Sequence, residues 1–348
     1  MTQYLIVCFV ATLLVPLSGY HGFGGSAEII AAGMALPSAV ALLIPLCWRS
    51  DTPPNRSPAP LMIYPLVALA VGRSLALLIN QPSDPFSSPR TMAAWAGIGA
   101  FYVARRDPDR IPGAIRTLAY FLVSLALIQA GPGLQGAFIN RNIVGGLLAM
   151  CLGAFLPEIN SEIPEKRGKN IFGVVLVIAG IIVTGSRGGM VAAAVTIAMY
   201  YGWFLRTLPV MAVSVPFLLQ IRNPNALSIR LSFWLDGIYT WLNHPLFGIG
   251  PQHLPCGAGH AHNIFLSILV WSGLVGLGLM IWGIWKSKSS WIRLPAWALA
   301  SLAGFIAQGI VDDLTPFPLV MVICGCLLGL DENPKINFDK TSKNTSNQ

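Results

Sequence analysis

One segment of the chain collects residues that can transfer protons or bind metal. Four of the five histidines lie between residues 222 and 262: His244, His253, His260 and His262. A histidine changes charge near neutral pH and can take a proton from a hydroxyl group, and His262 stands directly before a long apolar run. Together with Cys256, three of these histidines also offer four ligands of the type that zinc accepts, although their spacing matches no standard zinc finger. The segment is therefore a candidate site for proton transfer or, alternatively, for zinc.

Three arginines stand where a guanidinium group could bind an anion. Arg187 and Arg230 lie between apolar runs, and Arg73 lies inside one. A guanidinium group is planar, always charged and able to bind phosphate oxygens with two hydrogen bonds. A charge inside an apolar run long enough to span a membrane is costly and is usually functional. The alternative for Arg187 is that it only reaches out of the membrane to the polar interface.

The composition indicates which elements must position these side chains. Hydrophobic residues make up 54% of the 348 and charged residues 10%, with a mean hydropathy of +0.65, whereas soluble domains carry about 25% charged residues. This excludes a soluble enzyme, a disordered regulator and a small disulfide scaffold. We expect an all-α polytopic membrane protein, with one membrane-embedded domain over 1–330 and a disordered cytoplasmic tail over 331–348. The apolar runs predict about twelve spans: 3–18, 27–48, 61–80, 91–104, 113–130, 142–157, 171–184, 188–205, 208–221, 263–285, 294–311 and 317–330.

The distribution of basic residues predicts the orientation. With a cytoplasmic N-terminus, 15 of the 22 Lys and Arg residues fall on the cytoplasmic side and 5 on the opposite side. Such an excess is what the positive-inside rule requires, and it accounts for the net charge of +8 without a nucleic-acid partner. Both termini are then cytoplasmic, and segment 222–262 is an extracytoplasmic loop. Loops much longer than about 15 residues are usually functional or disordered, and this one is rich in tryptophan and glycine.

Residues 228–242 of that loop have the periodicity of a helix. Leu231, Trp234, Leu235 and Ile238 recur at three- and four-residue spacings on one face. Ser228 is expected to cap the start of this helix, and the helix should end before Pro245. The pattern predicts a short helix along the membrane surface with its tryptophans at the level of the lipid headgroups. It is either a simple anchor or, because of Arg230 in its first turn, part of a site.

Several short motifs occur in order between residues 138 and 285. They are Phe138-Ile-Asn-Arg-Asn142, Thr184-Gly-Ser-Arg-Gly-Gly189, Arg230 with Trp234, His244-Pro-Leu-Phe-Gly-Ile-Gly250, His262-Asn263 and Gly273-Leu-Val-Gly276. In order, spacing and predicted sidedness this set resembles the O-antigen ligase and O-antigen polymerase family of bacterial surface-polysaccharide enzymes. The first 130 residues resemble that family only as a series of hydrophobic spans.

The resemblance implies a metal-independent glycosyltransferase that needs no cofactor. Such an enzyme moves a glycan from an undecaprenyl-pyrophosphate carrier to an acceptor hydroxyl, on the periplasmic face of the bacterial cytoplasmic membrane. The acceptor would be lipid A core, a further glycan repeat unit or a protein side chain. His262 would be the general base, and Arg187 and Arg230 would bind the pyrophosphate. Further residues would contact substrate or hold the geometry of its loops: Arg73, Asn142, Trp234, His260 and Asn263.

Other interpretations stay open at this point. A polysaccharide or lipid transporter, or a flippase, would need polar residues along both halves of a path through the membrane. Here the unusual residues gather on one side, and no internal repeat is visible. The zinc site is a second alternative. Asp312 and Asp313, at the external end of another span, could pair with an arginine or contact sugar.

Overall fold

The part of the chain that the structure describes is helical. The computed structural model describes residues 61–81, 87–131, 140–203, 226–255, 261–310 and 312–330, and every regular element within these ranges is a helix. In chain order the elements are η1 (Leu61–Ile63), α3 (Tyr64–Asn80), α4 (Ser87–Arg106), η2 (Pro108–Arg110), α5 (Ile111–Gln129), α6 (Arg141–Leu152), η3 (Gly153–Asn160), α7 (Pro164–Thr184), α8 (Arg187–Tyr200), α10 (Ala226–Asn243), α11 (Ile264–Trp291), α12 (Ala296–Gly309) and α13 (Pro318–Leu328). The predicted spans 3–18, 27–48 and 208–221 and the tail 331–348 lie outside the described residues.

Five helical segments are long and apolar enough to cross a membrane. They are Leu61–Asn80, Pro108–Gln129, Arg141–Asn160, Pro164–Thr184 and Ile264–Trp291, and each overlaps a predicted span. Helices suit this environment because they satisfy their backbone hydrogen bonds internally. The chain therefore has the character of a helical membrane protein. Two further apolar helices, α12 and α13, are shorter than a span, and the total of twelve spans stays a prediction.

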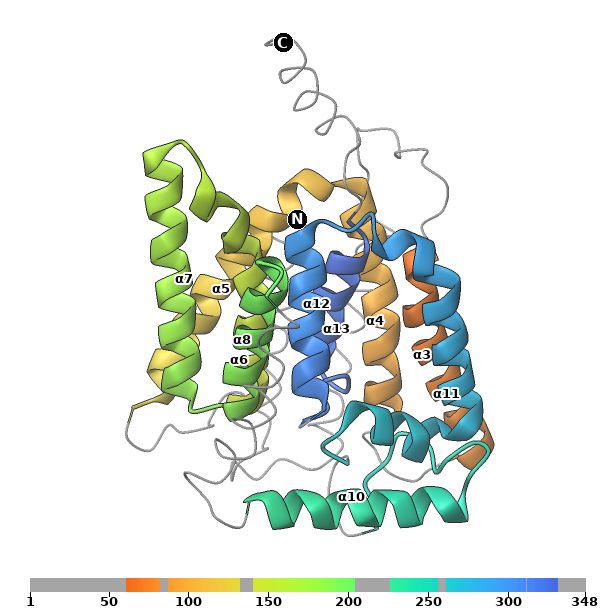
Figure 1. Cartoon of the computed structure of the whole chain (residues 1–348). Helices are drawn as coiled ribbons and strands as arrows, with labels where there is room; N and C mark the ends of the chain where they lie inside the picture. Colours follow the sequence, from red (N-terminus) through yellow and green to blue (C-terminus); the bar gives the residue numbers. More distant parts are fainter. Residues whose placement is uncertain are drawn as a thin grey trace.

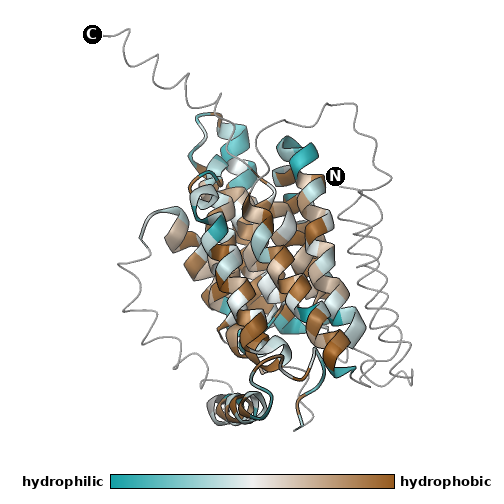
Figure 2. Ribbon diagram, turned by 90° about the vertical axis from the view of Figure 1, so that its right-hand side faces the viewer, coloured by the Kyte–Doolittle hydropathy of each residue, from teal (hydrophilic) through white to brown (hydrophobic). Residues whose placement is uncertain are grey.

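The helices form a bundle with one helix lying across its end (Figure 1). Helix α4 packs on α13, α3 on α11, and α8 on both α6 and α12. Helix α10 runs roughly perpendicular to the others, at the end of the bundle that also holds the α7–α8 and α12–α13 connections. We call this the α10 end. Apolar residues run through the middle of the bundle, and hydrophilic residues gather toward its ends (Figure 2).

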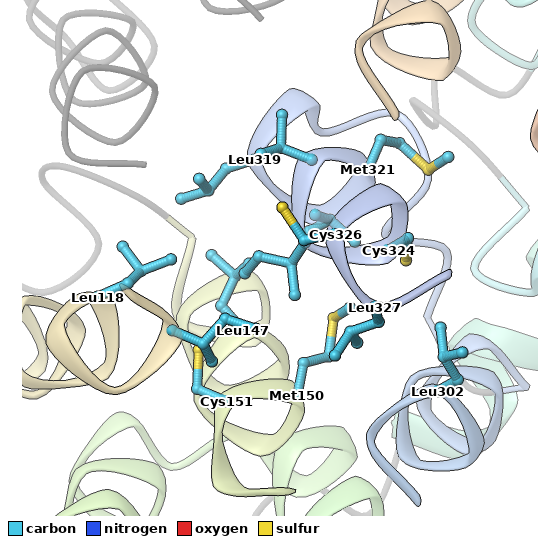
Figure 3. Close-up of a cluster of buried hydrophobic side chains, with 14 of the residues drawn as sticks. Leu118, Leu147, Met150, Cys151, Leu302, Leu319, Met321, Cys324, Cys326 and Leu327 are labelled. Carbon is cyan, nitrogen blue, oxygen red and sulfur yellow. The ribbon is translucent and has the colours of Figure 1, made fainter. Parts of the chain in front are cut away.

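A tightly packed apolar core holds the described helices together. Figure 3 shows part of it, with Leu118 of α5, Leu147 of α6 and Cys326 of α13 in the same cluster. All three side chains are buried, as are Cys151 and Cys324. Helix association within a membrane depends on such van der Waals packing, since lipid tails are as apolar as leucine.

The helix across the bundle end is close to its prediction. The pattern over 228–242 corresponds to α10, which ends at Asn243, before the predicted stop at Pro245. The predicted cap is wrong, because α10 already begins at Ala226 and Ser228 lies inside it. The outward side of α10 exposes large apolar residues: Leu231, Leu235, Ile238, Tyr239 and Leu242. This amphipathic character is what a helix at a membrane surface requires.

Candidate functional site

The site centres on an imidazole paired with a carboxylate. His262 Nδ1 lies 2.9 Å from Asp312 Oδ1, although the two residues are 50 positions apart in the chain. Asp312 is 5% exposed, and His262 is half-buried. When Nδ1 carries the proton and donates it to the carboxylate, Nε2 is left as a proton acceptor. Asp312 thus fixes both the tautomer and the orientation of the ring, which is the arrangement of a general base with its orienting partner.

The start of α11 holds His262 in place. Asn263 is the N-cap of this helix, and its Oδ1 accepts hydrogen bonds from the backbone N–H groups of Phe265 (3.0 Å) and Leu266 (3.1 Å). Its Nδ2 donates to the Ile310 carbonyl at 3.0 Å, which ties the cap to the segment before Asp312. His262 itself has a φ of 52°, in the left-handed region. The His-Asn motif therefore joins a capping residue to the candidate base.

Helix α6 contacts the second oxygen of Asp312. Asn142 Nδ2 donates to Asp312 Oδ2 at 3.0 Å. The backbone carbonyl of Asn142 in turn accepts a hydrogen bond from Gln308 Nε2 at 2.9 Å, and Gln308 is fully buried in α12. The carboxylate is thus held from both sides. Asn142 acts on the geometry of Asp312, and its predicted contact with substrate stays a prediction.

The Ser-Arg-Gly-Gly motif places Arg187 beside α6. Ser186 is the N-cap of α8, and its Oγ accepts a hydrogen bond from the Gly189 N–H at 3.1 Å. A Cβ at position 189 would lie 2.8 Å from the carbonyl carbon of Gly145, so the starts of α6 and α8 can approach only without a side chain there. Arg187 is the first residue of α8. A cation at that position opposes the helix dipole, whereas a bound anion would be favoured there.

Helix α10 brings a second arginine to the same place. Arg230 lies within electrostatic reach of both Asp312 and Arg187. Burial lowers the pKa of its guanidinium group below the ordinary value; the carboxylate of Asp312 raises this pKa, and the like charge of Arg187 lowers it further. The Nη1 atom of Arg230 is enclosed and has no hydrogen-bond partner among the described residues. A buried donor without a partner calls for an explanation, and an anion would supply one.

The inward side of α10 also covers the imidazole. The ring of Phe233 is stacked on that of His262, with the ring centroids 5.2 Å apart and the planes 21° from parallel. One turn further along, a Cβ on Gly237 would meet Leu266 and Ala261, so the helix lies close to the start of α11 at this point. Trp234 follows Phe233, and its Nε1 is enclosed without a hydrogen-bond partner in the described part of the chain.

Two of the glycine motifs form a single structural feature. Helix α11 is broken at Gly273 (φ 63°, ψ −162°), and a Cβ there would overlap the Leu246 carbonyl. Segment 245–250 pairs with the backbone on both sides of the break: Ile249 N to Val270 O (2.8 Å), Gly250 N to Trp271 O (3.1 Å), Leu274 N to Pro245 O (2.9 Å) and Val275 N to Leu246 O (3.1 Å). Such pairing is what allows a broken helix at membrane depth. As a result the first part of α11 turns away from the rest of the helix and lies next to α10 (Figure 1).

Arg73 lies in a separate buried cluster. Its side chain is 1% exposed, and its Nη1 donates to the carbonyl oxygens of Arg90 and Thr315, both at 3.1 Å. Its Nη2 donates to the Thr315 hydroxyl group. The guanidinium carbon lies 5.0 Å from the ring centroid of Trp271. The predicted contact of Arg73 with substrate stays a prediction.

The proposed zinc ligands fall partly outside the described residues. Cys256 and His260 are not described, so the predicted roles of both stay untested. His253 Nε2 lies 3.3 Å from Arg90 Nη2, and His262 is paired with Asp312. Within the described ranges, no group of three or more His, Cys, Asp and Glu side chains could hold a metal ion.

The role of Asp312 could not be assigned from the sequence alone. The structure places Asp312 between His262 and Asn142 and within electrostatic range of Arg230, whereas the sequence offered only sugar or an arginine as its partners. A pair of aspartates at the end of an apolar span was the only signal, and it could not distinguish Asp312 from Asp313. Taken together, the site can accept a proton at His262 Nε2 and hold an anion near Arg187 and Arg230. No protein-family model matches this chain, and no curated protein matches it.

Proposed function

We propose that this chain is a membrane glycosyltransferase of the O-antigen ligase or polymerase type. It would move a glycan from an undecaprenyl-pyrophosphate carrier to an acceptor hydroxyl at the α10 end of the bundle, which is then the periplasmic end in a bacterial cytoplasmic membrane. The observation that carries the proposal is the His262–Asp312 pair within electrostatic range of Arg230. A base with an orienting carboxylate, next to clustered guanidinium groups, suits a reaction in which a hydroxyl loses a proton while a phosphate group departs.

The reaction assigns one task to each group. The acceptor hydroxyl gives its proton to His262 Nε2, and its oxygen attacks the anomeric carbon of the glycan. The bond from that carbon to the pyrophosphate breaks, and the carrier leaves with the electron pair and one additional negative charge. Arg187 and Arg230 stabilise this charge with bidentate hydrogen bonds. Asp312 stabilises the imidazolium ion that forms and does not take the proton itself.

The setting of α10 suits a lipid-linked donor. Its outward side exposes Leu235 and Tyr239, and its inward side carries Arg230 and Phe233. A helix in the headgroup layer can bury that outward side in lipid. The pyrophosphate of a polyprenyl carrier lies at the same depth, because its lipid tail stays in the membrane. Membrane lipids and the carrier would thus meet the two sides of one helix.

A transfer assay with the natural donor tests the proposal. A strain that lacks this chain should accumulate its carrier-linked glycan, and a lipid extract of that strain supplies the donor whichever sugars it contains. Purified protein in detergent is mixed with this extract and with lipid A core, or with the extract alone. The proposal predicts glycan on lipid A core (a ligase) or longer carrier-linked chains (a polymerase). A transporter would give neither product, because detergent leaves no two compartments.

A further inference from the structure

Two adjacent aspartates in the α12–α13 connection face different partners. Asp312 contacts His262 and Asn142. Asp313 is fully buried, and its Oδ1 accepts hydrogen bonds from Thr315 N (2.9 Å) and Thr315 Oγ1 (2.7 Å). Because the two residues are joined by one peptide unit, any contact that fixes Asp313 also limits where the Asp312 carboxylate can lie.

Arg73 holds this connection from the opposite side. It donates to both the carbonyl oxygen and the hydroxyl group of Thr315, which are 242 positions away in the chain. Asp313 lies within electrostatic range of Arg73, and its negative charge offsets part of the cost of burying the guanidinium group. We call Arg73, Asp313 and Thr315 the arginine clamp. All three side chains are buried.

The same arginine also contacts the half of α11 that begins beside His262. Its guanidinium group lies over the ring of Trp271, which stands two residues before the break at Gly273. Trp271 is itself fixed, since its Nε1 donates to the Gln252 carbonyl at 3.0 Å. Arg73 therefore touches both elements that carry the His262–Asp312 pair. Burying a charge within an apolar helix is costly. Such a cost is offset if Arg73 fixes the α12–α13 connection and the first part of α11 relative to each other.

We infer that the arginine clamp positions Asp312, and through it His262, so that Arg73 is a positioning residue. The kinetic consequence of this inference rests on the proposed function. The side chain of Arg73 is 1% exposed, and its Nη1 and Nη2 donors are directed at protein oxygens. The observed contacts thus support this role over direct contact with substrate. Loss of the clamp would let Asp312 move away from Nδ1, and misplacement of a catalytic group by about 1 Å can lower a rate by about 10²-fold.

Thr315→Val is the most informative variant. Valine has nearly the shape of threonine, but its side chain can neither donate to Asp313 nor accept from Arg73, while the backbone contacts of residue 315 with both residues are retained. We expect kcat for glycan transfer to fall by about 10- to 100-fold with KM for the donor little changed. Thr117→Val is the matched control, because its exposed hydroxyl group only bonds the Gly113 carbonyl within α5. A rise in KM with kcat unchanged would overturn the inference in favour of substrate binding.

A double variant separates positioning from a general effect on stability. In an Asp312→Asn background the clamp has no carboxylate to position, so adding Thr315→Val should cause less than a twofold further loss. Independent structural damage would instead multiply the two losses. Arg73→Lys keeps the charge but loses the planar fork, and it should behave as Thr315→Val does.

A chemical label tests the clamp without any activity assay. Diethyl pyrocarbonate reacts at a histidine ring nitrogen, and mass spectrometry of the peptide that contains His262 gives the labelling rate in intact protein. Thr315→Val should change this rate in the same direction as Asp312→Asn, and the double variant should add nothing further. Equal rates in Thr315→Val, Thr117→Val and the parent protein would overturn the inference. If the labelling rate changes but the parent protein transfers no glycan, the inference about the arginine clamp is supported and the proposed function is refuted.

Discussion

Replacing Asp312 by asparagine removes the negative charge beside His262 and retains the shape of the side chain. The carboxylate now accepts from His262 Nδ1 at 2.9 Å and from Asn142 Nδ2 at 3.0 Å. An asparagine has one acceptor oxygen and one donor group at these two positions. If its amide nitrogen faces the imidazole, Nδ1 must accept a hydrogen bond, and the ring proton then lies on Nε2. In this tautomer Nε2 cannot act as a base. If its oxygen faces the imidazole, Asn142 must turn to avoid a contact between two donors.

The size of the effect distinguishes a functional role from a structural one. When His262 takes up a proton, the ring and the carboxylate carry opposite charges about 4 Å apart, which is worth roughly 4 kcal/mol at an effective dielectric constant of 20. This corresponds to about a thousandfold in rate. Loss of an ordinary hydrogen bond, at about 1 kcal/mol, would cost only about fivefold.

The assay is single-turnover glycan transfer by purified Asp312→Asn protein, with Asp107→Asn as the control. Asp107 undergoes the same chemical change at the opposite end of the bundle, where it forms an ion pair with the exposed Arg110. We expect a loss of about 10²- to 10⁴-fold for Asp312→Asn and less than twofold for Asp107→Asn. A loss below about fivefold at Asp312, with normal folding, would refute the role of its charge.

Three further predictions follow from the geometry. Arg230→Lys keeps the charge but loses the bidentate fork, so transfer should fall by roughly 10²-fold while membrane insertion, measured by fractionation, stays normal. Gly189→Ala forces α8 away from α6 and should lower the free energy of unfolding, measured in thermal melts, by about 1–3 kcal/mol. The control Gly113→Ala places its methyl group in open space and should leave that free energy unchanged. Equal melting temperatures for the two variants would contradict the packing argument. A reporter fused after Lys169 should be cytoplasmic and one inserted within 252–259 should be external; if both report the same side, the proposed orientation is wrong.

Within the described ranges every predicted apolar span falls on a helix, but the ends of these helices depend on polar residues as well. The run 171–184 is part of α7, which begins earlier, at Pro164. Its first turns are polar and are supported by the pair Glu165–Lys169 at 2.6 Å. A hydropathy pattern cannot detect such an extension, because the exposed turns of a helix beyond the membrane need no apolar residues.

The contacts that define the site join residues far apart in the chain, so the sequence alone could not predict which side chains pair with each other. The position of Arg187 between two apolar runs is a local feature that the sequence predicted, whereas the cap that Ser186 forms on α8 emerged only from the structure. The pairing of His262 with Asp312, in contrast, joins two helix ends that meet only in the folded bundle. The break at Gly273 is an intermediate case. Its glycine motif is visible in the sequence, but its pairing with segment 245–250 is a contact between separate elements.

The rate of glycan transfer by purified His262→Gln protein tests the central claim most directly. Glutamine keeps a polar side chain of similar reach but cannot accept the acceptor's proton, so the rate should fall by about 10²- to 10⁴-fold. Binding of the carrier-linked donor should be largely retained, because in the proposed mechanism the arginines and not the imidazole hold the pyrophosphate. His21→Gln, in the first predicted external loop, serves as the control and should transfer glycan normally. A wild-type rate of transfer in His262→Gln would contradict the proposed mechanism.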